Sequence, residues 1–210
     1  MKTLFNTDEL RRIFGKYLAT HHQQDADTGS LGFAGIHYAF LRVLKPMRAL
    51  AVGSAKGFIP AVMGKALADN GVGALDFVDA GYKEGVDANA WSGQGFWRDK
   101  PDDWFEGLPV RTFVMTFEEF CAEAKSAIWG YAYIDSDHSR EGTSRHMTLA
   151  WNRLPAGAIL SLHDTDAASG HPSTQGPHAA VKEFLEAVPS ASAVALSAFP
   201  GLTLIQKQGA

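Results

Sequence analysis

The stretch Ala49–Phe58 constrains the fold of this chain more than any other. An uncharged run, 49–52, is followed directly by Gly53, with Gly57 four residues later, and 59–69 then has apolar side chains at helical spacing. A strand, a glycine turn and a helix in this order begin a βαβ unit. Gly53 would let the backbone turn sharply beside a ligand that faces the first amides of the helix. The stretch therefore predicts either a nucleotide-binding turn or an ordinary strand-to-helix connection.

The next apolar run, 74–78, ends at Asp79. An acid at the tip of the second strand is suited to hydrogen bonds with ribose hydroxyls. The alternative is an acid that merely flanks a helix. Because the strand, the turn, the helix and the acid follow one another in register, we favour a nucleotide site that contains Gly53 and Asp79.

The rest of the chain continues the alternation of strands and helices. Further strands are predicted at 110–115, 131–134, 158–162, 193–197 and 202–205, and helices from Thr116, from near Arg140 and over 179–188. This order predicts an α/β fold: a mostly parallel seven-stranded sheet with an antiparallel C-terminal hairpin and helices on both faces. Ligands of such sheets bind at the carboxyl ends of the strands.

The 210 residues suit a single domain, 1–210, with one full core. Two predicted helices, one starting near Thr7 and one over 33–44, are candidates for an N-terminal cap, about 1–46, over the site. A Trp-rich insertion, about 81–107, holds three of the five tryptophans. It is either a wall of a ligand pocket or a hydrophobic cover over the edge of the sheet.

Composition excludes several classes of partner. The formal net charge of −4 gives no basic footprint, so we expect no nucleic acid as a partner. No apolar run has the length needed to span a membrane. Cys121 is the only cysteine, which excludes an internal disulfide and fits a cytoplasmic, reducing location.

Titratable side chains gather after two of the predicted strands: Asp135, Asp137, His138, His163, Asp164 and Asp166. Carboxylate and imidazole groups can hold a divalent ion such as Mg²⁺ or Mn²⁺, and a histidine beside such an ion can act as a general base. Asp137 could instead cap the next helix, Asp166 could be a solvated acid, and His163 could bond a backbone carbonyl. We favour a functional role for Asp135, His138 and Asp164.

Together these motifs resemble the class I S-adenosylmethionine (SAM)-dependent methyltransferases, and most closely the methyltransferase 24 family and sugar O-methyltransferases. The matching stretches are VGSAKGF at 52–58, Asp79, YIDSDHSREG at 133–142 and LPAGAILSLHDT at 154–165. The resemblance extends over about 35–205 and implies the Rossmann-like class I methyltransferase fold.

The resemblance assigns cofactor contacts by position. The glycine turn would line the methionine and ribose end of SAM, the acid after the second strand would bind the ribose, and the residues after the third strand would meet adenine. The expected cofactor-binding residues are Gly53, Ser54, Gly57, Asp79, Thr116, Phe117 and Asp135. The family often has an acid two residues before the first glycine, where this chain has Ala51. This departure weakens the expected contact to the SAM amino group.

The resemblance also assigns catalytic and metal-binding residues. Asp135 and Asp164 would hold Mg²⁺ or Mn²⁺ together with His163, and the catalytic residues would be His138, as the base, and Asp135. In the sugar enzymes an acid usually stands at the position of His163. This difference leaves open whether the protein requires a metal.

The activity implied by the resemblance is methyl transfer from SAM to a hydroxyl of a sugar or small molecule. Such an in-line displacement needs positioning and a base for the hydroxyl proton. Three alternatives stay open: a SAM-binding module without catalysis, an NAD(P)-dependent oxidoreductase, and a metal hydrolase. The oxidoreductase fits less well because Ala55 replaces the second glycine of Gly-x-Gly-x-x-Gly. Expected partners are a small-molecule or glycan acceptor, with a homodimer as an alternative to a monomer.

Overall fold

A seven-stranded sheet with the strand order β5-β4-β3-β6-β7-β9-β8 forms the centre of the computed structural model. Its strands are β3 (Arg48–Val52), β4 (Ala74–Val78), β5 (Val110–Phe113), β6 (Tyr131–Ile134), β7 (Ile159–His163), β8 (Ser192–Leu196) and β9 (Leu202–Gln206). The first five run parallel, whereas β9 and β8 are antiparallel. This topology confirms the predicted mostly parallel sheet with a C-terminal hairpin. The structure describes residues 24–25, 30–54, 57–80 and 105–209.

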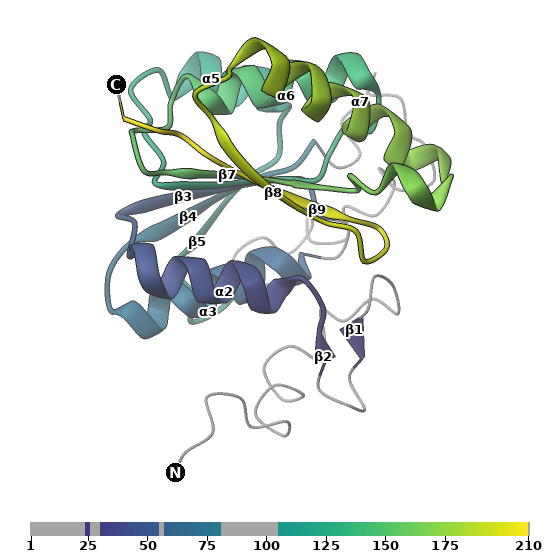
Figure 1. Ribbon diagram of the computed structural model, residues 1–210. Coiled ribbons are helices and arrows are strands. Elements are labelled where there is room, and N and C mark those ends of the chain that lie inside the picture. The colour runs from purple at the N-terminus through teal and green to yellow at the C-terminus, as the bar shows by residue number, and fades with distance from the viewer. Residues whose placement is uncertain (1–23, 26–29, 55–56, 81–104, 210) are drawn as a thin grey trace.

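Helices cover both faces of this sheet (Figure 1). On one face lie α2 (Ala34–Leu44) and α3 (Phe58–Asn70), and on the other lie α5 (Phe117–Glu123), α6 (Arg140–Trp151) and α7 (Pro172–Ala187). Each face has its own cluster of buried apolar side chains. Because both faces are covered, the central parallel strands are apolar on both sides, and β6 is buried at every residue.

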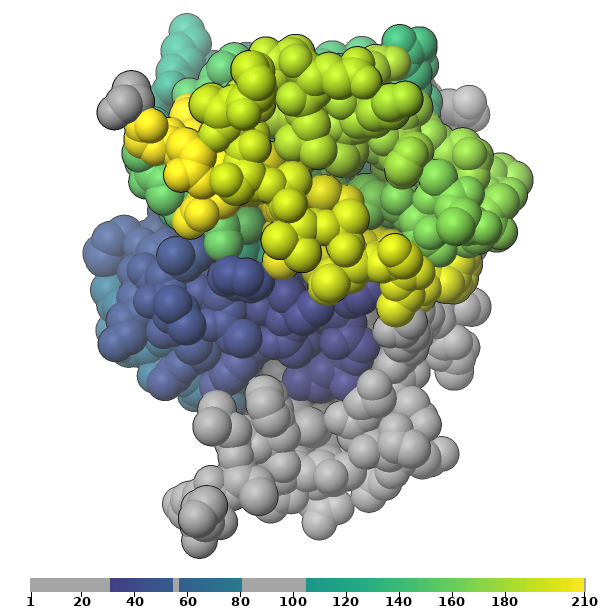
Figure 2. Space-filling view, in the orientation of Figure 1, coloured from purple at the N-terminus to yellow at the C-terminus, as the bar shows by residue number. Residues whose placement is uncertain are grey.

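The C-terminal hairpin closes one edge of the sheet. In the space-filling view the hairpin and α7 form one continuous surface, and the hairpin part of this surface meets α2 directly (Figure 2). On the inner strand, Leu204 packs against the core cluster that contains Ala34 and Tyr38 of α2. The outer strand β8 is an edge strand and is exposed along most of its length.

Two local predictions were wrong. The Gly, Pro and Ser residues of the segment 167–177 predict a loop, but it contains the short 3₁₀ helix η2 (Ala167–Ser169) and the start of α7. Pro172 occupies the first turn of α7, where its missing N–H costs nothing, and His171 caps the helix. The polar stretch 21–29 likewise predicts a loop, but it contains the short strand β1 (Gln24–Asp25), which pairs antiparallel with β2 (Ser30–Leu31) just beyond it.

Other predicted features lie outside the described residues. These are the helix expected near Thr7 and the Trp-rich insertion up to residue 104. The end of the insertion is described, and there Phe105 packs edge-on against Phe77 of β4 at 5.6 Å between ring centroids. Within the described part of the chain, no helix is long and apolar enough to span a bilayer.

The strand order positions the site. From β3 the chain builds outward through β4 to β5, and it then returns to the other side of β3 to form β6. The helices that follow β3 and β6, α3 and α6, lie on opposite faces of the sheet (Figure 1). In sheets of this type, ligands bind in the crevice at the carboxyl ends of the two strands where the order reverses. The candidate site is therefore expected after β3 and β6.

Candidate functional site

The turn after β3 is pressed against the loop after β6. Gly53 has a φ of 70°, and its amide donates to the Val78 carbonyl at 2.9 Å. A Cβ at this position would overlap the carbonyl oxygen of Asp135 and would lie 2.9 Å from the Cα of Ser136. Only glycine therefore allows the two loops to approach this closely. Gly57, with a φ of 75°, precedes the first residue of α3.

Asp79 lies beside this turn. Val52 and Val78 are partners in the register of β3 and β4, so the residues that follow them, Gly53 and Asp79, leave the sheet at the same edge. The amide of Asp79 donates to the Phe113 carbonyl at 3.0 Å, which connects this edge to β5. The structure thus brings together the two residues that define the nucleotide-site prediction.

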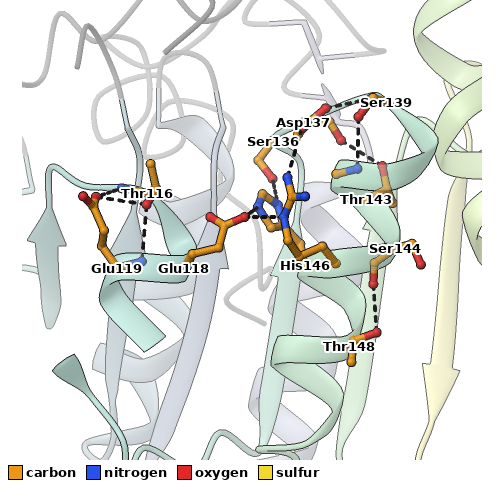
Figure 3. A network of polar contacts seen from close by, with 12 residues as sticks. Thr116, Glu118, Glu119, Ser136, Asp137, Ser139, Thr143, Ser144, His146 and Thr148 are labelled. Atoms are coloured by element: carbon orange, nitrogen blue, oxygen red, sulfur yellow. Dashed lines mark hydrogen bonds and ion pairs between the residues drawn. The ribbon is translucent and has the colours of Figure 1, made fainter. Parts of the chain in front are cut away.

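Helix α5 begins at the same edge, after β5. Thr116 caps it as predicted: its side chain accepts from the Glu119 amide, and Glu119 accepts from the Thr116 amide at 3.0 Å (Figure 3). The Phe117 side chain is buried in the core, with its ring 6.1 Å from that of Trp129. Backbone groups rather than the Phe117 ring therefore face the edge of the sheet.

An acid–histidine cluster occupies the carboxyl ends of β6 and β7. His138 Nε2 lies 2.9 Å from Asp164 Oδ2 and 3.4 Å from Asp135 Oδ1. One ligand atom from each of these residues lies within 4.8 Å of the others. Asp164 has a φ of 57°, a conformation that non-glycine residues rarely adopt and that recurs at functional sites. Two carboxylates and an imidazole at this spacing could hold a divalent metal ion.

His163 is the fourth member of the cluster. Its Nδ1 lies 3.5 Å from Asp135 Oδ1 and 3.4 Å from Asp164 Oδ2, and its side chain is buried. The ring also meets Phe33, at the start of α2, edge-on at 6.1 Å. The N-terminal end of α2 therefore borders the cluster, while the helix itself packs on α3 and the sheet.

The four groups perturb one another's pKa values. Burial alone would lower the pKa of His138, but hydrogen bonds and charges from Asp135 and Asp164 outweigh it and raise the pKa to about 10. The same balance raises the pKa of His163 to about 10. Burial raises the pKa of each aspartate, and the histidines more than offset this, so both pKa values lie below their usual range. The two carboxylates therefore favour the protonated form of both histidines, and the histidines favour the ionised form of both carboxylates.

Sequence reasoning missed the residues of β6 and α2 that support the acid–histidine cluster. The Tyr133 hydroxyl donates to Asp135 Oδ2 at 2.8 Å. Behind it, His37 of α2 bonds the Tyr131 hydroxyl at 2.6 Å and lies edge-on to the Tyr133 ring at 4.7 Å. A signal for Tyr133 was available, because residues two apart on a strand share a face and Asp135 follows Tyr133 by two. For His37 the sequence gives only a polar residue within an apolar helix.

The two remaining acids of the predicted set have local roles. Asp137 Oδ1 accepts from the Ser139 amide at 2.8 Å, and Ser139, not Asp137, caps α6 by accepting from the Gly142 amide at 3.0 Å (Figure 3). Asp166 caps η2 by accepting from the Ala168 amide at 3.1 Å. Of the two local roles open to these acids, capping and solvation, Asp166 therefore has the capping role.

Many solved structures share this fold, and three of them illustrate it. TomG from Streptomyces achromogenes, an O-methyltransferase involved in tomaymycin synthesis and in complex with SAM, has 13% identity over 97% of this chain and 89% of its own, with a TM-score of 0.64. The O-methyltransferase from Bacillus cereus in complex with SAH has 14% identity over 96% and 90%, with a TM-score of 0.62. The SAH-bound methyltransferase PaMTH1 of Podospora anserina has 14% identity over 97% and 86%, with a TM-score of 0.64.

Comparison of the sequence itself gives the family. No curated protein matches the chain. A family model described as a methyltransferase domain matches residues 50–165, which is more than half of the chain and extends from the glycine turn to the residue after Asp164. Both the glycine turn and the acid–histidine cluster thus lie inside the matched region, and the chain belongs to the methyltransferase 24 family of methyltransferase domains.

Proposed function

We propose that this protein is a SAM-dependent O-methyltransferase whose reaction centre is the cluster of Asp135, His138 and Asp164. One observation carries the proposal: the cluster lies directly beside the glycine turn. The Asp135 amide donates to the Val52 carbonyl at 2.8 Å, and its carbonyl oxygen contacts Gly53. A cofactor on the turn would therefore meet an acceptor held at the cluster.

The residues at the edge of the sheet fit SAM. Gly53, Ser54 and Gly57 would hold its methionine and ribose end, Asp79 would accept from the ribose hydroxyls, and the first turn of α5, at Thr116 and Phe117, would border the adenine. SAM supplies a methyl group on a sulfonium. TomG in complex with SAM and the Bacillus cereus enzyme in complex with SAH, which share the fold, support this assignment.

His138 is the proposed base. Its Nε2 lies close to both carboxylates, and its side chain is 21% exposed, so an acceptor hydroxyl can approach the imidazole from solvent. To accept a proton, the imidazole must first be neutral. The charges of Asp135 and Asp164 raise the pKa of His138, so compensation of those charges restores the neutral form.

Asp135, Asp164 and His163 are the proposed metal ligands. A bound Mg²⁺ or Mn²⁺ would orient the acceptor hydroxyl and lower its pKa. Tyr133 prepares this ligand set, because its hydroxyl occupies Asp135 Oδ2 and leaves Oδ1 toward His138 and His163. The identity of the ion stays part of the proposal.

The proposal also includes a class of methyl acceptor, an oligomeric state and a cellular location. We propose a hydroxyl of a sugar, another small molecule or a glycan as the methyl acceptor. A homodimer is proposed through β8, an exposed edge strand whose five residues, SAVAL, have no charge to discourage pairing with a second copy. A cytoplasmic location fits the single, buried thiol of Cys121.

Two alternatives stand differently against these observations. The family match favours methyl transfer over an NAD(P)-dependent oxidoreductase. A SAM-binding module without catalysis would have the same fold and the same glycine turn. Only turnover separates that module from an enzyme.

The test measures conversion of SAM to SAH with a panel of sugar and phenolic hydroxyl acceptors. We expect turnover by the wild-type protein and a loss of about 10²–10⁴-fold in His138→Ala, the usual span for a general base. SAM affinity, measured by calorimetry, should be unchanged in this variant because the glycine turn is intact. EDTA should abolish turnover, and Mg²⁺ or Mn²⁺ should restore it.

The outcomes separate the parts of the proposal. Near-normal turnover of His138→Ala would contradict the role of His138 as the base. Full activity in excess EDTA would contradict only the proposed metal and would leave the proposed base in place. Tight SAM binding without turnover on any acceptor would favour the non-catalytic module. Failure to bind SAM at all would overturn the proposal.

A further inference from the structure

A second polar array lies at the same edge of the sheet as the acid–histidine cluster, but on the opposite face of the sheet. Ser136 Oγ is 2.8 Å from His146 Nδ1, and His146 Nε2 is 3.3 Å from Glu118 Oε1 (Figure 3). Arg145 reaches the same carboxylate oxygen through Nε at 2.5 Å. The four residues come from three elements: the loop after β6, the middle of α6, which supplies both Arg145 and His146, and the first turn of α5.

The protonation state of the array follows from its surroundings. His146 is 7% exposed, and the Phe117 ring meets it edge-on at 5.6 Å. Burial lowers the pKa of His146, so the ring is neutral at pH 7 and carries one proton. With that proton on Nε2, the ring donates to Glu118 and accepts from the Ser136 hydroxyl at Nδ1. The hydroxyl is thus held in one orientation.

The array connects the two ends of the cofactor edge. At one end, Ser136 is packed on the glycine turn, with its Cα 2.9 Å from where a Cβ on Gly53 would be. At the other end, Glu118 follows the capping residue Thr116 by two, on the helix that starts beyond β5. Strands β5, β4, β3 and β6 are consecutive neighbours in the sheet. The array therefore spans the same strands as the proposed SAM site.

We propose that Ser136, His146 and Glu118 are positioning residues for the adenosine half of SAM. His146 holds the loop after β6 against the glycine turn and ties that loop to the start of α5, so that the two ends of the site keep a fixed separation. This inference rests on the proposed SAM site. Because SAM and SAH share the adenosine half, the array affects both ligands equally and does not distinguish the methyl group.

The same order of residues, serine, histidine and glutamate, also occurs in hydrolytic triads. Here Arg145 already compensates the charge of Glu118, which reduces the support that the carboxylate could give to an imidazolium. The array also lies across the edge of the sheet from the acid–histidine cluster. In a positioning role, the ion pair of Arg145 with Glu118 helps to hold the array in place. In a nucleophilic triad this ion pair has no function.

The experiment is a double-mutant cycle on the full-length protein, with SAM and SAH each titrated by calorimetry. We expect Ser136→Ala and His146→Leu each to weaken the binding of both ligands by about 5–150-fold, the effect of one hydrogen bond lost with its partner left unsatisfied. The double variant should bind no more weakly than the weaker single variant, because either change breaks the same chain. Ser136→Thr keeps the hydroxyl and should restore binding.

Thr148→Ala is the matched control, since it removes a hydroxyl of α6 that donates only to the Ser144 carbonyl, at 3.0 Å (Figure 3). It should bind both ligands as the wild type does. Additive losses in the cycle, or folded Ser136→Ala and His146→Leu proteins with normal affinity, would overturn the inference while the SAM site stands. If His146→Leu does not fold, the comparison of Ser136→Ala with Ser136→Thr decides. A wild-type protein that binds neither ligand would overturn the proposed function and this inference with it.

Discussion

At His37, burial disfavours the protonated, charged form of the side chain. Its side chain is fully buried between α2 and the sheet and bonds the Tyr131 hydroxyl. Burial, followed by the charge of His163, lowers the pKa of His37 to about 3, against 6.5 for a solvated histidine. The residue therefore folds as a neutral imidazole. Its position behind Tyr133 also means that a proton on His37 would be felt at Asp135.

His37 should make stability depend on pH. Its pKa is lower in the folded than in the unfolded state, so between pH 6.5 and 3 the unfolded chain binds the extra proton. The free energy of unfolding should therefore fall as the pH falls through this window. In His37→Gln the slope should be flatter by about 1.4 kcal/mol per pH unit well below pH 6.5, because one proton no longer titrates. Urea unfolding between pH 7 and pH 4.5 measures the slope, and equal slopes in the two proteins would contradict the assignment.

Helix α5 illustrates how much one short element depends on its cap. It has seven residues, too few for a helix to be stable without fixed ends. The capping box between Thr116 and Glu119 satisfies two amides at its start. Glu118, in the same turn, faces Arg145 and His146 of α6. The start of α5 is thus held both by its own side chains and by a neighbouring helix.

Thr116→Ala should lower the free energy of unfolding of the cofactor-free protein by about 1 kcal/mol, the typical cost of a lost N-cap. Denaturation by urea measures it, with Thr148→Ala as the control, because that hydroxyl lies within a helix and caps nothing. We expect less than 0.5 kcal/mol, in either direction, for the control, as for most surface substitutions. Equal effects of the two changes would mean that the cap does not stabilise the fold.

At the scale of the whole molecule, Asp76 connects the strands on one side of the sheet. Its carboxylate, in β4, is fully buried and forms ion pairs with Arg48 of β3 and, at 2.6 Å, with Arg111 of β5. It also accepts from Trp129 Nε1 at 2.9 Å, just before β6. Four segments of the sheet thus share one buried charge.

Removal of the Asp76 carboxylate should lower the stability of the whole domain. Asp76→Ala leaves the buried Trp129 N–H without its acceptor and two arginines without a counter-ion, and we expect a loss of about 3 kcal/mol of unfolding free energy. The arginines are 30% and 51% exposed and can turn to water, which places the value at the lower end of the usual range. Arg111→Ala should cost less than about 1 kcal/mol, as for exposed ion pairs. Thermal unfolding measures both, and a smaller loss for Asp76→Ala than for Arg111→Ala would contradict this role.

The sequence by itself determined the order of the elements and the edge of the sheet that holds the site. Apolar runs, the glycine turn after Val52 and the capping pattern at Thr116 are local signals, and each depends on residues that are neighbours in the chain. Even there the sequence misplaced the start of α7, because Pro172 breaks a helix in its interior but not in its first turn.

The sequence already predicted that Asp135 and Asp164 share one site, and they meet because β6 pairs in parallel with β7. Only the tertiary structure separated them from Asp137 and Asp166, which each accept from the backbone amide two residues further along the chain. The Tyr133 contact to Asp135 could be inferred from the strand period, but those made by His37 and His146 could not. Their partners are distant in the sequence or lie on other elements, and periodicity encodes which face of an element is buried, not what packs against it.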